Sequence, residues 1–359
     1  MRLFVTMRCM RRWYLASLAG LVVATAGAAS ADGPGRRFDL QAHRGGAGLV
    51  VENTSAAFAN ALELGVSTLE LDVQITADGF AVVTHDRDPS PDKCVDTAPA
   101  FTGDPQFPYV PGAQSIRDLT LAQVRTIDCG SKKLAVFPDQ RAVPGQRMPL
   151  LSEVFDLVRA YRADDVVLNI ETKVEAGAPE QTAPREQFVQ VVAAEVRRAH
   201  IENRVTIQSF DWGALMRMRQ VAPELPIVAL TNGQQFLQVG EAGASPWLGG
   251  IDIDDFSGSL PEKYVAAAAS FGANILSPVH GGPQDGTVED PGYAAFTTAE
   301  LVRAAHDRGM AVVPWTVDDR ATMTALLDLG VDGLITNRPD LLRAILAERG
   351  YRLPRSYRR

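Results

Sequence analysis

The sequence has few cysteines, no long hydrophobic segment and no glycine-rich dinucleotide motif. Its one extended apolar run, LASLAGLVVATAGAASA, is shorter than the roughly 20 residues that a transmembrane helix needs, which argues against a membrane anchor. The first predicted strand has no glycine-rich dinucleotide turn after it and no His-x-His pair at its end. These absences argue against a dinucleotide-binding open sheet and against a metal enzyme of the amidohydrolase type. No repeat of fixed period is present.

Positive charge is also scarce, because 43 acidic residues outnumber 35 lysines and arginines and give a formal net charge of −8. This balance argues against a groove for nucleic acid. The composition is otherwise ordinary for a globular protein, with 46% hydrophobic and 22% charged residues in 359 positions. A chain of this length has room for one large α/β barrel or two medium domains.

The amino terminus has the pattern of a cleavable signal peptide. Four arginines precede the apolar run, which ends in the small residues Ala29-Ser30-Ala31. We therefore expect a signal peptide over residues 1–31 and an exported mature protein over residues 32–359, periplasmic or secreted and without a stable membrane anchor. Removal of four arginines and no acidic residue would change the net charge from −8 to −12.

The cysteines are consistent with export. Cys9 lies in the predicted signal peptide ahead of the apolar run, so it is not placed like a lipoprotein cysteine. Cys94 and Cys129 lie 35 positions apart in a region rich in proline and glycine. In an oxidising compartment a disulfide between them would close a loose loop and stabilise the fold by roughly 3–4 kcal/mol. Two unrelated thiols are the alternative.

Short β-rich runs alternate with helical patterns along the whole chain. Parallel strands joined by helices, repeated about eight times, predict a (β/α)8 TIM barrel, with a doubly wound open sheet as the alternative. The predicted strands are 39–45, 68–76, 166–173, 204–210, 226–231, then either 250–254 or 273–278, followed by 311–317 and 332–337.

One long interruption separates the second predicted strand from the third. Residues 87–148, which follow the hairpin closed by His85, are rich in Pro, Gly, Asp and Thr, and only residues 115–127 have a helical pattern. A long irregular segment inside a compact domain is usually a functional loop or an added subdomain. We therefore expect a loop-rich insertion at about 87–148.

Two carboxylates at alternate positions of one predicted strand raise an electrostatic question. Glu70 and Asp72 share one face of the strand and, if buried together, need a compensating positive charge. Glu171 and Lys173 repeat this spacing on the next strand. Because functional residues gather at the carboxyl ends of barrel strands, the three carboxylates predict a site for a divalent metal, Ca²⁺ or Mg²⁺.

The cationic and titratable residues at the same strand ends have different uses. Arg44 and Lys173 have no reason to face a metal ion, so we expect them to face an anion bound to it, most simply a phosphate. His43 and His85 are then available for proton transfer, because imidazole titrates near neutral pH. Taken alone, either histidine would more often be only a hydrogen-bonding residue.

Other polar and aromatic residues near strand ends carry a weaker signal. Gln208 ends a predicted strand, and Trp315 ends another, where the ring packs either over a ligand or in the core. His280 follows a strand in SPVHGGP and is a further candidate for the mouth of the barrel. His200 and His306 lie in amphipathic helices, where we expect surface or packing roles.

Five separated blocks of the chain match a known pattern. The first is HRGGAGLVVENTSAAFANALELGVSTLELDVQITADGFAVVTHD, and it is followed in order by NIETK, TIQSFDW, VPWTV and DGLITNRP. Together they resemble the glycerophosphodiester phosphodiesterase family over nearly all of residues 39–345. The resemblance implies a (β/α)8 barrel that hydrolyses a small-molecule glycerophosphodiester to glycerol 3-phosphate and an alcohol, with a divalent metal.

The resemblance also implies a role for each residue discussed above. It assigns acid/base catalysis to His43 and His85, phosphate binding to Arg44 and Lys173, and metal binding to Glu70, Asp72 and Glu171. Glu52, in the ENT motif, would be a supporting carboxylate, and residues 87–148 would be the family's inserted region. The sequence departs from the family in one visible place, since the usual proline before ENT is Val51 here.

Two questions about the reaction stay open at the level of sequence. The glycerol 2-hydroxyl could attack first and form a cyclic phosphate, or water could attack directly. The alternative activity is that of a phospholipase D-like enzyme on the same barrel, which acts on lysophospholipid or sphingomyelin. A non-catalytic binding protein would be expected to lack one of the histidines or metal ligands, and all of them are present.

Overall fold

The computed structural model describes residue 35 and residues 37–359. The predicted signal peptide, residues 1–31, lies outside the described residues. In the part of the chain that the structure describes, no helix combines the length and apolar character needed to cross a membrane.

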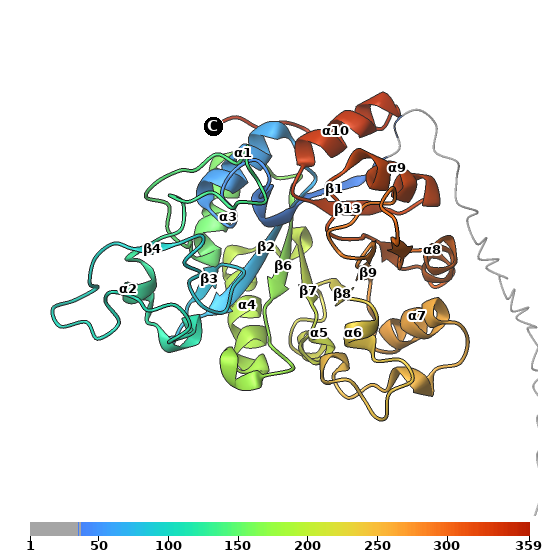
Figure 1. Cartoon of the computed structure of the whole chain (residues 1–359), viewed down its shortest axis with the longest axis horizontal. Coiled ribbons are helices and arrows are strands. Elements are labelled where there is room, and N and C mark those ends of the chain that lie inside the picture. The colour runs from blue at the N-terminus through green and yellow to red at the C-terminus, as the bar shows by residue number, and fades with distance from the viewer. Residues whose placement is uncertain (1–34, 36) are drawn as a thin grey trace, which may run out of the picture. The chain divides into compact units, whose positions relative to one another are not determined.

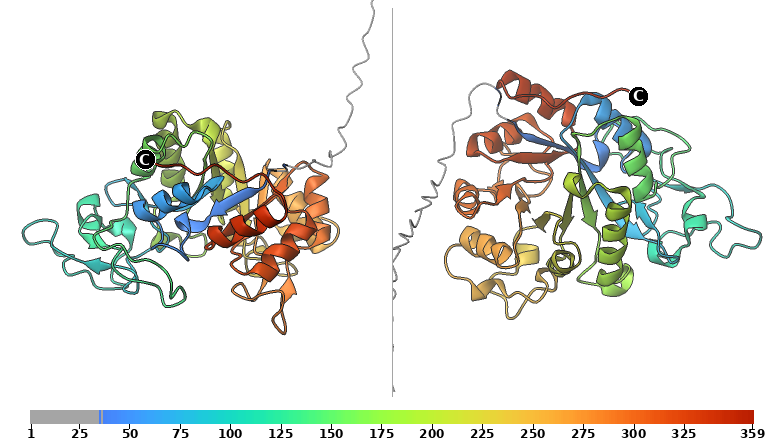
Figure 2. Two further views of the ribbon diagram at one scale, coloured as in Figure 1. Left: turned by 90° about the horizontal axis from the view of Figure 1, so that it is seen from above. Right: turned by 180° about the vertical axis from the view of Figure 1, so that it is seen from behind.

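Eight parallel strands form a nearly closed barrel surrounded by helices (Figures 1 and 2). The hydrogen-bonded order around the barrel is β12-β9-β8-β7-β6-β2-β1-β13. The predicted TIM barrel is therefore confirmed. The barrel strands are β1 (Asp39–Ala42), β2 (Thr68–Ile75), β6 (Val167–Thr172), β7 (Val205–Ser209), β8 (Ile227–Thr231), β9 (Ile275–Pro278), β12 (Ala311–Val312) and β13 (Gly333–Thr336).

The seam between β12 and β13 is joined by backbone hydrogen bonds rather than by a regular strand pair. Asp332 N donates to the carbonyl of Val312 at 2.9 Å, and Ile335 N donates to the carbonyl of Pro314 at 3.0 Å. Pro314 has no N–H to return such a bond, which interrupts the ladder. The predicted strand at 311–317 is accordingly only two residues long in the structure.

The helices follow the strands as the sequence pattern predicts. Helix α1 begins after Thr54, whose side chain accepts a hydrogen bond from Ala57 N, and it ends at Gly65, where φ is 91°. The helices are α1 (Ser55–Leu64), α2 (Leu121–Val124), α3 (Leu151–Ala160), α4 (Arg185–Ala199), α5 (Trp212–Val221), α6 (Gln234–Leu237), α7 (Leu260–Ser270), α8 (Ala299–His306), α9 (Arg320–Leu329) and α10 (Pro339–Glu348).

Of the two alternatives for the sixth barrel strand, the structure contains the later one. Residues 275–278 form β9, whereas residues 253–255 form a short 3-10 turn. The side chain of Asp252 accepts a hydrogen bond from the backbone N–H of Asp254, which bends the chain locally. Aspartate at this position therefore favours a turn over the strand that the apolar residues suggest.

The core explains why β2 tolerates polar residues at every second position. Leu69, Leu71 and Val73 belong to the main hydrophobic cluster that the strands share with the surrounding helices. Glu70 and Asp72 alternate with them and are equally buried, each with 1% of its surface exposed. Because successive side chains of a strand point to opposite faces, these carboxylates lie inside the barrel.

The insertion is a small folded unit beside the barrel, attached through the hairpin of β2 and β3 (Ala81–Val83) (Figures 1 and 2). It contains a two-stranded antiparallel sheet of β4 (Val95–Asp96) and β5 (Ile127–Asp128), and a disulfide joins Cys94 to Cys129. Its own hydrophobic cluster comprises Val82, Ile116, Leu119, Val124, Ile127 and Met148. The insertion is thus more ordered than its turn-rich composition suggests.

Candidate active site

A cavity of about 600 Å³ opens at the carboxyl ends of the barrel strands. One wall is polar and comes from the loop after β1, from β2, β6 and β7, and from the start of the insertion. Another wall is largely aromatic, with Phe210, Phe236, Trp247 and Trp315. The polar wall includes His43, Arg44, Glu70, His85, Asp86, Glu171, Lys173 and Gln208.

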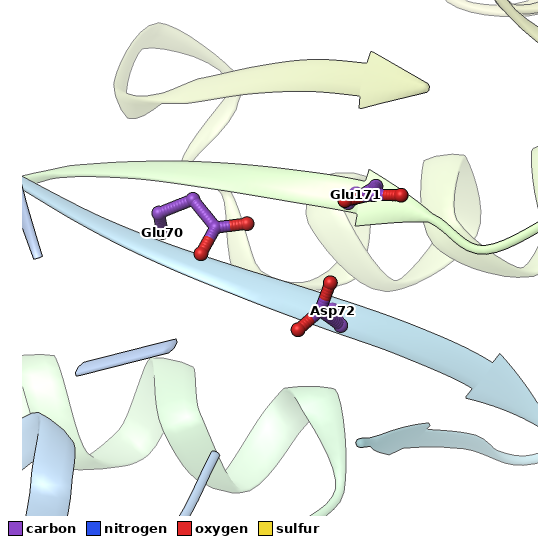
Figure 3. Close-up of side chains that lie close together, drawn as sticks. All are labelled: Glu70, Asp72 and Glu171. Atoms are coloured by element: carbon purple, nitrogen blue, oxygen red, sulfur yellow. The ribbon is translucent and has the colours of Figure 1, made fainter. Parts of the chain in front are cut away.

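Three buried carboxylates lie together at the edge of this cavity. Figure 3 shows Glu70 and Asp72 on β2 and Glu171 on the adjacent β6. One oxygen of each lies within 4.8 Å of the others. The parallel register pairs Asp72 directly with Glu171, so the fold itself brings the two strands' acids together. The predicted cluster is therefore present as a geometric unit.

The electrostatics of the cluster show an unmet need for positive charge. Burial raises the pKa of Glu70 well above its ordinary range, and the neighbouring charges of Asp72 and Glu171 add to this effect. Burial also raises the pKa of Glu171 to about 7, although Lys173 opposes the shift. Oδ1 of Asp72 is buried and has no hydrogen-bond partner among the described residues. Such a set of oxygens fits a hard divalent cation.

A chain of amides orients Glu70 from inside the barrel. Gln208 Nε2 donates to Glu70 Oε1 at 2.7 Å, and Gln208 Oε1 accepts from Asn169 Nδ2 at 2.8 Å. The second hydrogen bond fixes which end of the Gln208 amide faces Glu70. Gln208 therefore supports a carboxylate of the cluster, while Asn169 is a contributor that the sequence analysis did not identify.

Arg44 contacts the acids through both its backbone and its side chain. Its φ of 52° turns the backbone N–H toward Glu70 Oε2, to which it donates at 2.8 Å. The guanidinium Nη1 lies 3.0 Å from Glu52 Oε1, and Nε lies 3.3 Å from Asp72 Oδ2. Arg44 is thus held between Glu52 and Asp72 at the polar wall.

Lys173 lies on the same wall, and its Nζ is 2.8 Å from Glu171 Oε1 and 3.7 Å from Asp72 Oδ1. Burial alone would raise the pKa of Asp72, but the charges of His85, Arg44 and Lys173 outweigh it and hold the pKa well below its ordinary range. The two cations therefore contact the acid cluster directly, whereas the sequence pattern suggested that they would face only an anion.

The two histidines lie on the same polar wall, and the Nδ1 atom of each contacts a side-chain oxygen of a neighbouring residue. His43 Nδ1 lies 2.7 Å from Asn337 Oδ1, and His43 Nε2 lies 4.0 Å from Glu70 Oε2. His85 Nδ1 lies 2.7 Å from Asp86 Oδ1. Burial and the charge of Arg44 lower the pKa of His43 to about 3 and that of His85 to about 4. Both rings are therefore neutral near pH 7 in this structure.

Lys93 is a site residue that sequence reasoning missed. Its Nζ lies 2.8 Å from Glu52 Oε1 and 2.6 Å from Asp86 Oδ2, so one ammonium links Asp86 of the polar wall to Glu52, the partner of Arg44. Burial opposes ionisation of Glu52, but Arg44 and Lys93 lower its pKa to about 2. Lys93 belongs to an irregular stretch without periodicity, and only its position beside Cys94 hinted at a defined location.

Trp315 lines the cavity and also packs in a small hydrophobic cluster. Its ring lines the cavity, its Nε1 donates to the Ser277 carbonyl at 3.0 Å, and it packs edge-on against Phe210 at 5.2 Å. His280 is not among the cavity-lining residues. It is almost fully buried and contacts the Tyr293 hydroxyl and the Gln284 carbonyl. His280 is thus a hydrogen-bonding residue of the loop after β9.

The remaining histidines lie away from the cavity. His200 caps the end of α4 with a φ of 55°, and His306, on α8, pairs with Asp332 at 2.9 Å. The surface roles expected for both agree with these positions.

Known proteins are similar to this chain over most of its length. The sequence model of the Glycerophosphoryl diester phosphodiesterase family matches residues 43–341. A glycerophosphodiester phosphodiesterase of Caldanaerobacter subterraneus subsp. tengcongensis is 30% identical over 309 residues, covering 86% of this chain and 98% of that protein. One from Bacillus subtilis is 27% identical over 316 residues and covers 86% of both chains.

Solved structures agree with the fold. A Silicibacter pomeroyi protein, provisionally named for the same activity, superposes with a TM-score of 0.69 at 31% identity and covers 89% of this chain and 96% of its own. An Oleispira antarctica phosphodiesterase, solved with the product sn-glycerol-3-phosphate, gives a TM-score of 0.60 at 18% identity, with 86% and 96% covered. From the match to the family's sequence model and from the similarity to these relatives, it follows that the chain belongs to the glycerophosphoryl diester phosphodiesterase family.

Proposed function

We propose that this chain hydrolyses glycerophosphodiesters to glycerol 3-phosphate and an alcohol in a reaction that depends on a divalent metal and on histidine acid/base catalysis. The observation that carries the proposal is the juxtaposition of the buried acid cluster with two cations and two histidines around one cavity. Family membership and the relatives' activity support the same reaction.

In this proposal Glu70, Asp72 and Glu171 hold the metal, Ca²⁺ or Mg²⁺. The ion would act as a Lewis acid and offset negative charge on the phosphoryl oxygens. The raised pKa values of Glu70 and Glu171 support this assignment, because each reflects a buried carboxylate without enough positive charge nearby. Oδ1 of Asp72 lacks a hydrogen bond among the described residues and is available as a ligand.

Arg44 and Lys173 bind the phosphate in the proposed mechanism. Both side chains are mostly buried, at 17% and 14% exposure, and both reach the cavity beside the acid cluster. Their positive charges would stabilise the extra charge that develops as phosphorus becomes five-coordinate. Glu52 holds Arg44 in place through Nη1, which is why we assign it a supporting role.

His43 and His85 transfer the protons. One Nε2 takes the proton of the attacking hydroxyl. The other histidine gives a proton to the departing alcohol oxygen, and the negative charge of a bound phosphodiester would favour the protonated form that this step needs. The bond from phosphorus to the alcohol breaks as the bond to the attacking oxygen forms. Attack by the glycerol 2-hydroxyl would give a cyclic phosphate that water opens next, whereas attack by water would give the product directly. Phosphorus NMR of the reaction distinguishes these routes by the presence or absence of the cyclic species.

The aromatic wall supports a second candidate substrate. Phe210, Phe236, Trp247 and Trp315 give the cavity an apolar side that glycerol and phosphate alone would leave uncovered. An acyl chain of a lysophospholipid could cover it, as the phospholipase D-like alternative requires. We rank this substrate second, because the smaller diesters need only the polar wall and do not depend on the aromatic one.

We also propose that the mature protein is exported after cleavage of residues 1–31. The disulfide between Cys94 and Cys129 supports this location, because such bonds persist in oxidising compartments. Mass determination of the amino terminus of protein recovered from outside the cytoplasm tests the cleavage site. An amino terminus that retains the apolar run would contradict it.

The deciding experiment measures the products released from a panel of glycerophosphodiesters and lysophospholipids, with and without a chelator. Cleavage gives glycerol 3-phosphate from the diesters and acylated glycerol 3-phosphate from the lysophospholipids. We expect the diesters to be cleaved, the chelator to stop the reaction, and added Ca²⁺ or Mg²⁺ to restore it. Faster cleavage of the lysophospholipids would favour the second candidate. Release that the chelator does not affect would refute the metal requirement, and no release from any substrate would refute the proposed reaction.

A further inference from the structure

Three side chains at adjacent strand ends form a hydrogen-bonded row that leads to His43. Asp318 follows β12, Asn337 follows β13, and His43 follows β1, so the row crosses the seam of the barrel. We propose that Asp318 and Asn337 are positioning residues that hold His43 in its Nδ1–H tautomer, with the Nε2 lone pair facing the cavity. The effect of this tautomer on turnover rests on the proposed function of His43 in proton transfer.

The contacts of Asp318 fix the orientation of the Asn337 amide. Asp318 Oδ1 accepts from the backbone N–H of Asn337 at 2.7 Å and from the Thr336 hydroxyl at 3.1 Å. Asp318 Oδ2 accepts from Asn337 Nδ2 at 2.7 Å. Since an ionised carboxylate can only accept, the amide must turn its NH₂ group toward Asp318.

This orientation leaves only the amide oxygen of Asn337 for the histidine. Asn337 Oδ1 lies 2.7 Å from His43 Nδ1, and an amide oxygen cannot donate. The proton of the neutral imidazole must therefore be on Nδ1. Nε2 is then unprotonated, and it lies on the side of the ring that faces Glu70 Oε2 at 4.0 Å. A base that takes a proton within the cavity needs this tautomer.

Asn337, the middle residue of the row, is the most buried of the three. Only 7% of it is exposed, whereas Asp318 is half-buried and 15% of the His43 side chain is exposed. The Asn337 backbone is fixed on both sides, because its N–H donates to Asp318 and its carbonyl accepts from Gly48 N at 3.0 Å. The hydrogen bonds of Asn337 are therefore largely shielded from water, and the tautomer follows from the contacts of Asn337 with Asp318 and His43.

The variant Asp318→Asn removes the charge and tests the inference, because it should reverse the direction of the hydrogen bonds along the row. An amide at position 318 keeps one oxygen for the Asn337 N–H but places NH₂ where Oδ2 was. Asn337 must then flip, present its oxygen to residue 318 and donate from Nδ2 to His43 Nδ1. His43 would carry its proton on Nε2, which is the wrong tautomer for a base in the cavity. We expect kcat to fall by about 10²–10⁴, with KM nearly unchanged.

The double variant Asp318→Asn/Asn337→Asp exchanges the amide and the carboxylate and should restore the tautomer. The amide at position 318 would donate to the new carboxylate at position 337, whose other oxygen accepts from His43 Nδ1–H. We expect the double variant to recover at least about tenfold in kcat over Asp318→Asn. Asp328→Asn, on the surface of α9, is the matched control and should behave as the wild type.

Nitrogen NMR of protein labelled at its five histidines gives a readout that does not depend on turnover. We expect His43 to carry its proton on Nδ1 in the wild type and in the double variant, and on Nε2 in Asp318→Asn. A native-like circular dichroism spectrum shows that each variant is folded. An unchanged tautomer in folded Asp318→Asn, or a kcat within about threefold of the wild type, would overturn the inference. If the wild type releases no glycerol 3-phosphate, the proposed function fails while the NMR result still decides the positioning role.

Discussion

Lys93, from the insertion, places its ammonium 2.8 Å from a carboxylate oxygen of Glu52 in the loop after β1. These residues are 41 positions apart in the chain, and neither belongs to a barrel strand. The same ammonium contacts Asp86, which in turn contacts His85. The insertion therefore supplies a charge to the polar wall of the cavity as well as a folded unit beside it.

The substitution Lys93→Met should reduce kcat/KM by about tenfold to a hundredfold. It leaves Glu52 and Asp86 without their shared counter-charge, so both would compete for Arg44 and disturb His85. Steady-state kinetics measures the loss. Lys133→Met is the matched control, because Lys133 is in the same insertion, donates to the Pro138 carbonyl at 3.5 Å and is not one of the described residues that line the cavity. Equal rates for the two variants would show that Lys93 has no part in the site.

Divalent metal should raise the melting temperature of the wild type. Binding relieves the repulsion of three buried carboxylates, and metal at a hundred times its Kd adds about 2.7 kcal/mol, or about 5 °C. Thermal unfolding after chelation and after addition of Ca²⁺ or Mg²⁺ measures the shift. Glu70→Gln should lose most of it, whereas the substitution Glu241→Gln, at an exposed position, should retain it. A Glu70→Gln variant with the full wild-type shift would remove Glu70 from the proposed ligands.

His43→Ala and His85→Ala should each lower turnover by about 10²–10⁴, because each removes a proton-transfer group without a substitute. Circular dichroism should remain native, since neither side chain belongs to the hydrophobic clusters. His306→Gln, on the surface of α8, serves as the control histidine. Near-normal turnover by either alanine variant would mean that the acid/base assignment is wrong.

Reduction of the disulfide should destabilise the protein by roughly 3–4 kcal/mol, provided that barrel and insertion unfold together. The bond closes a loop with a sequence separation of 35, and reduction restores that loop's freedom in the unfolded chain. Urea unfolding with and without a reductant measures the difference. The variant Cys94→Ser/Cys129→Ser should be equally destabilised and insensitive to the reductant. Equal stability of oxidised and reduced wild type would contradict this account.

His280 should make stability fall as the pH is lowered below about 6.5. Burial lowers the pKa of His280 in the folded state, so below its ordinary value of 6.5 the unfolded chain binds a proton that the folded chain does not. His43 and His85 act in the same direction, so the contribution of His280 is the difference between the wild type and His280→Gln. Unfolding free energies between pH 7 and pH 5 should show a shallower slope for the variant, and identical slopes would contradict the prediction.

The barrel and the acid cluster could be predicted because both follow from local periodicity. Glu70 and Asp72 are two positions apart on one strand, and so are Glu171 and Lys173, which fixes their faces before any tertiary contact is known. The choice between 250–254 and 273–278 was not decidable in this way, since it depended on a hydrogen bond from Asp254 N to the Asp252 side chain.

The contributions of Lys93 and Asn337 could not be predicted, because they arise from contacts between distant segments. Asn337 lies 294 positions from His43, and its hydrogen bond depends on closure of the barrel between β13 and β1. Lys93 lies in an irregular stretch whose path is set by the hydrophobic cluster of the insertion and by the disulfide. Neither residue has a periodic pattern that would mark its direction.

The disulfide also separates two parts of the insertion that differ in what they contact. Residues 86–91, ahead of Cys94, supply cavity-lining side chains, whereas no cavity-lining residue in the described chain comes from 95–128. The exposed tip at 98–103 is therefore a suitable point at which to graft a fluorophore or an affinity handle. Such a graft would allow the enzyme to be immobilised or followed by fluorescence while the reacting groups remain untouched.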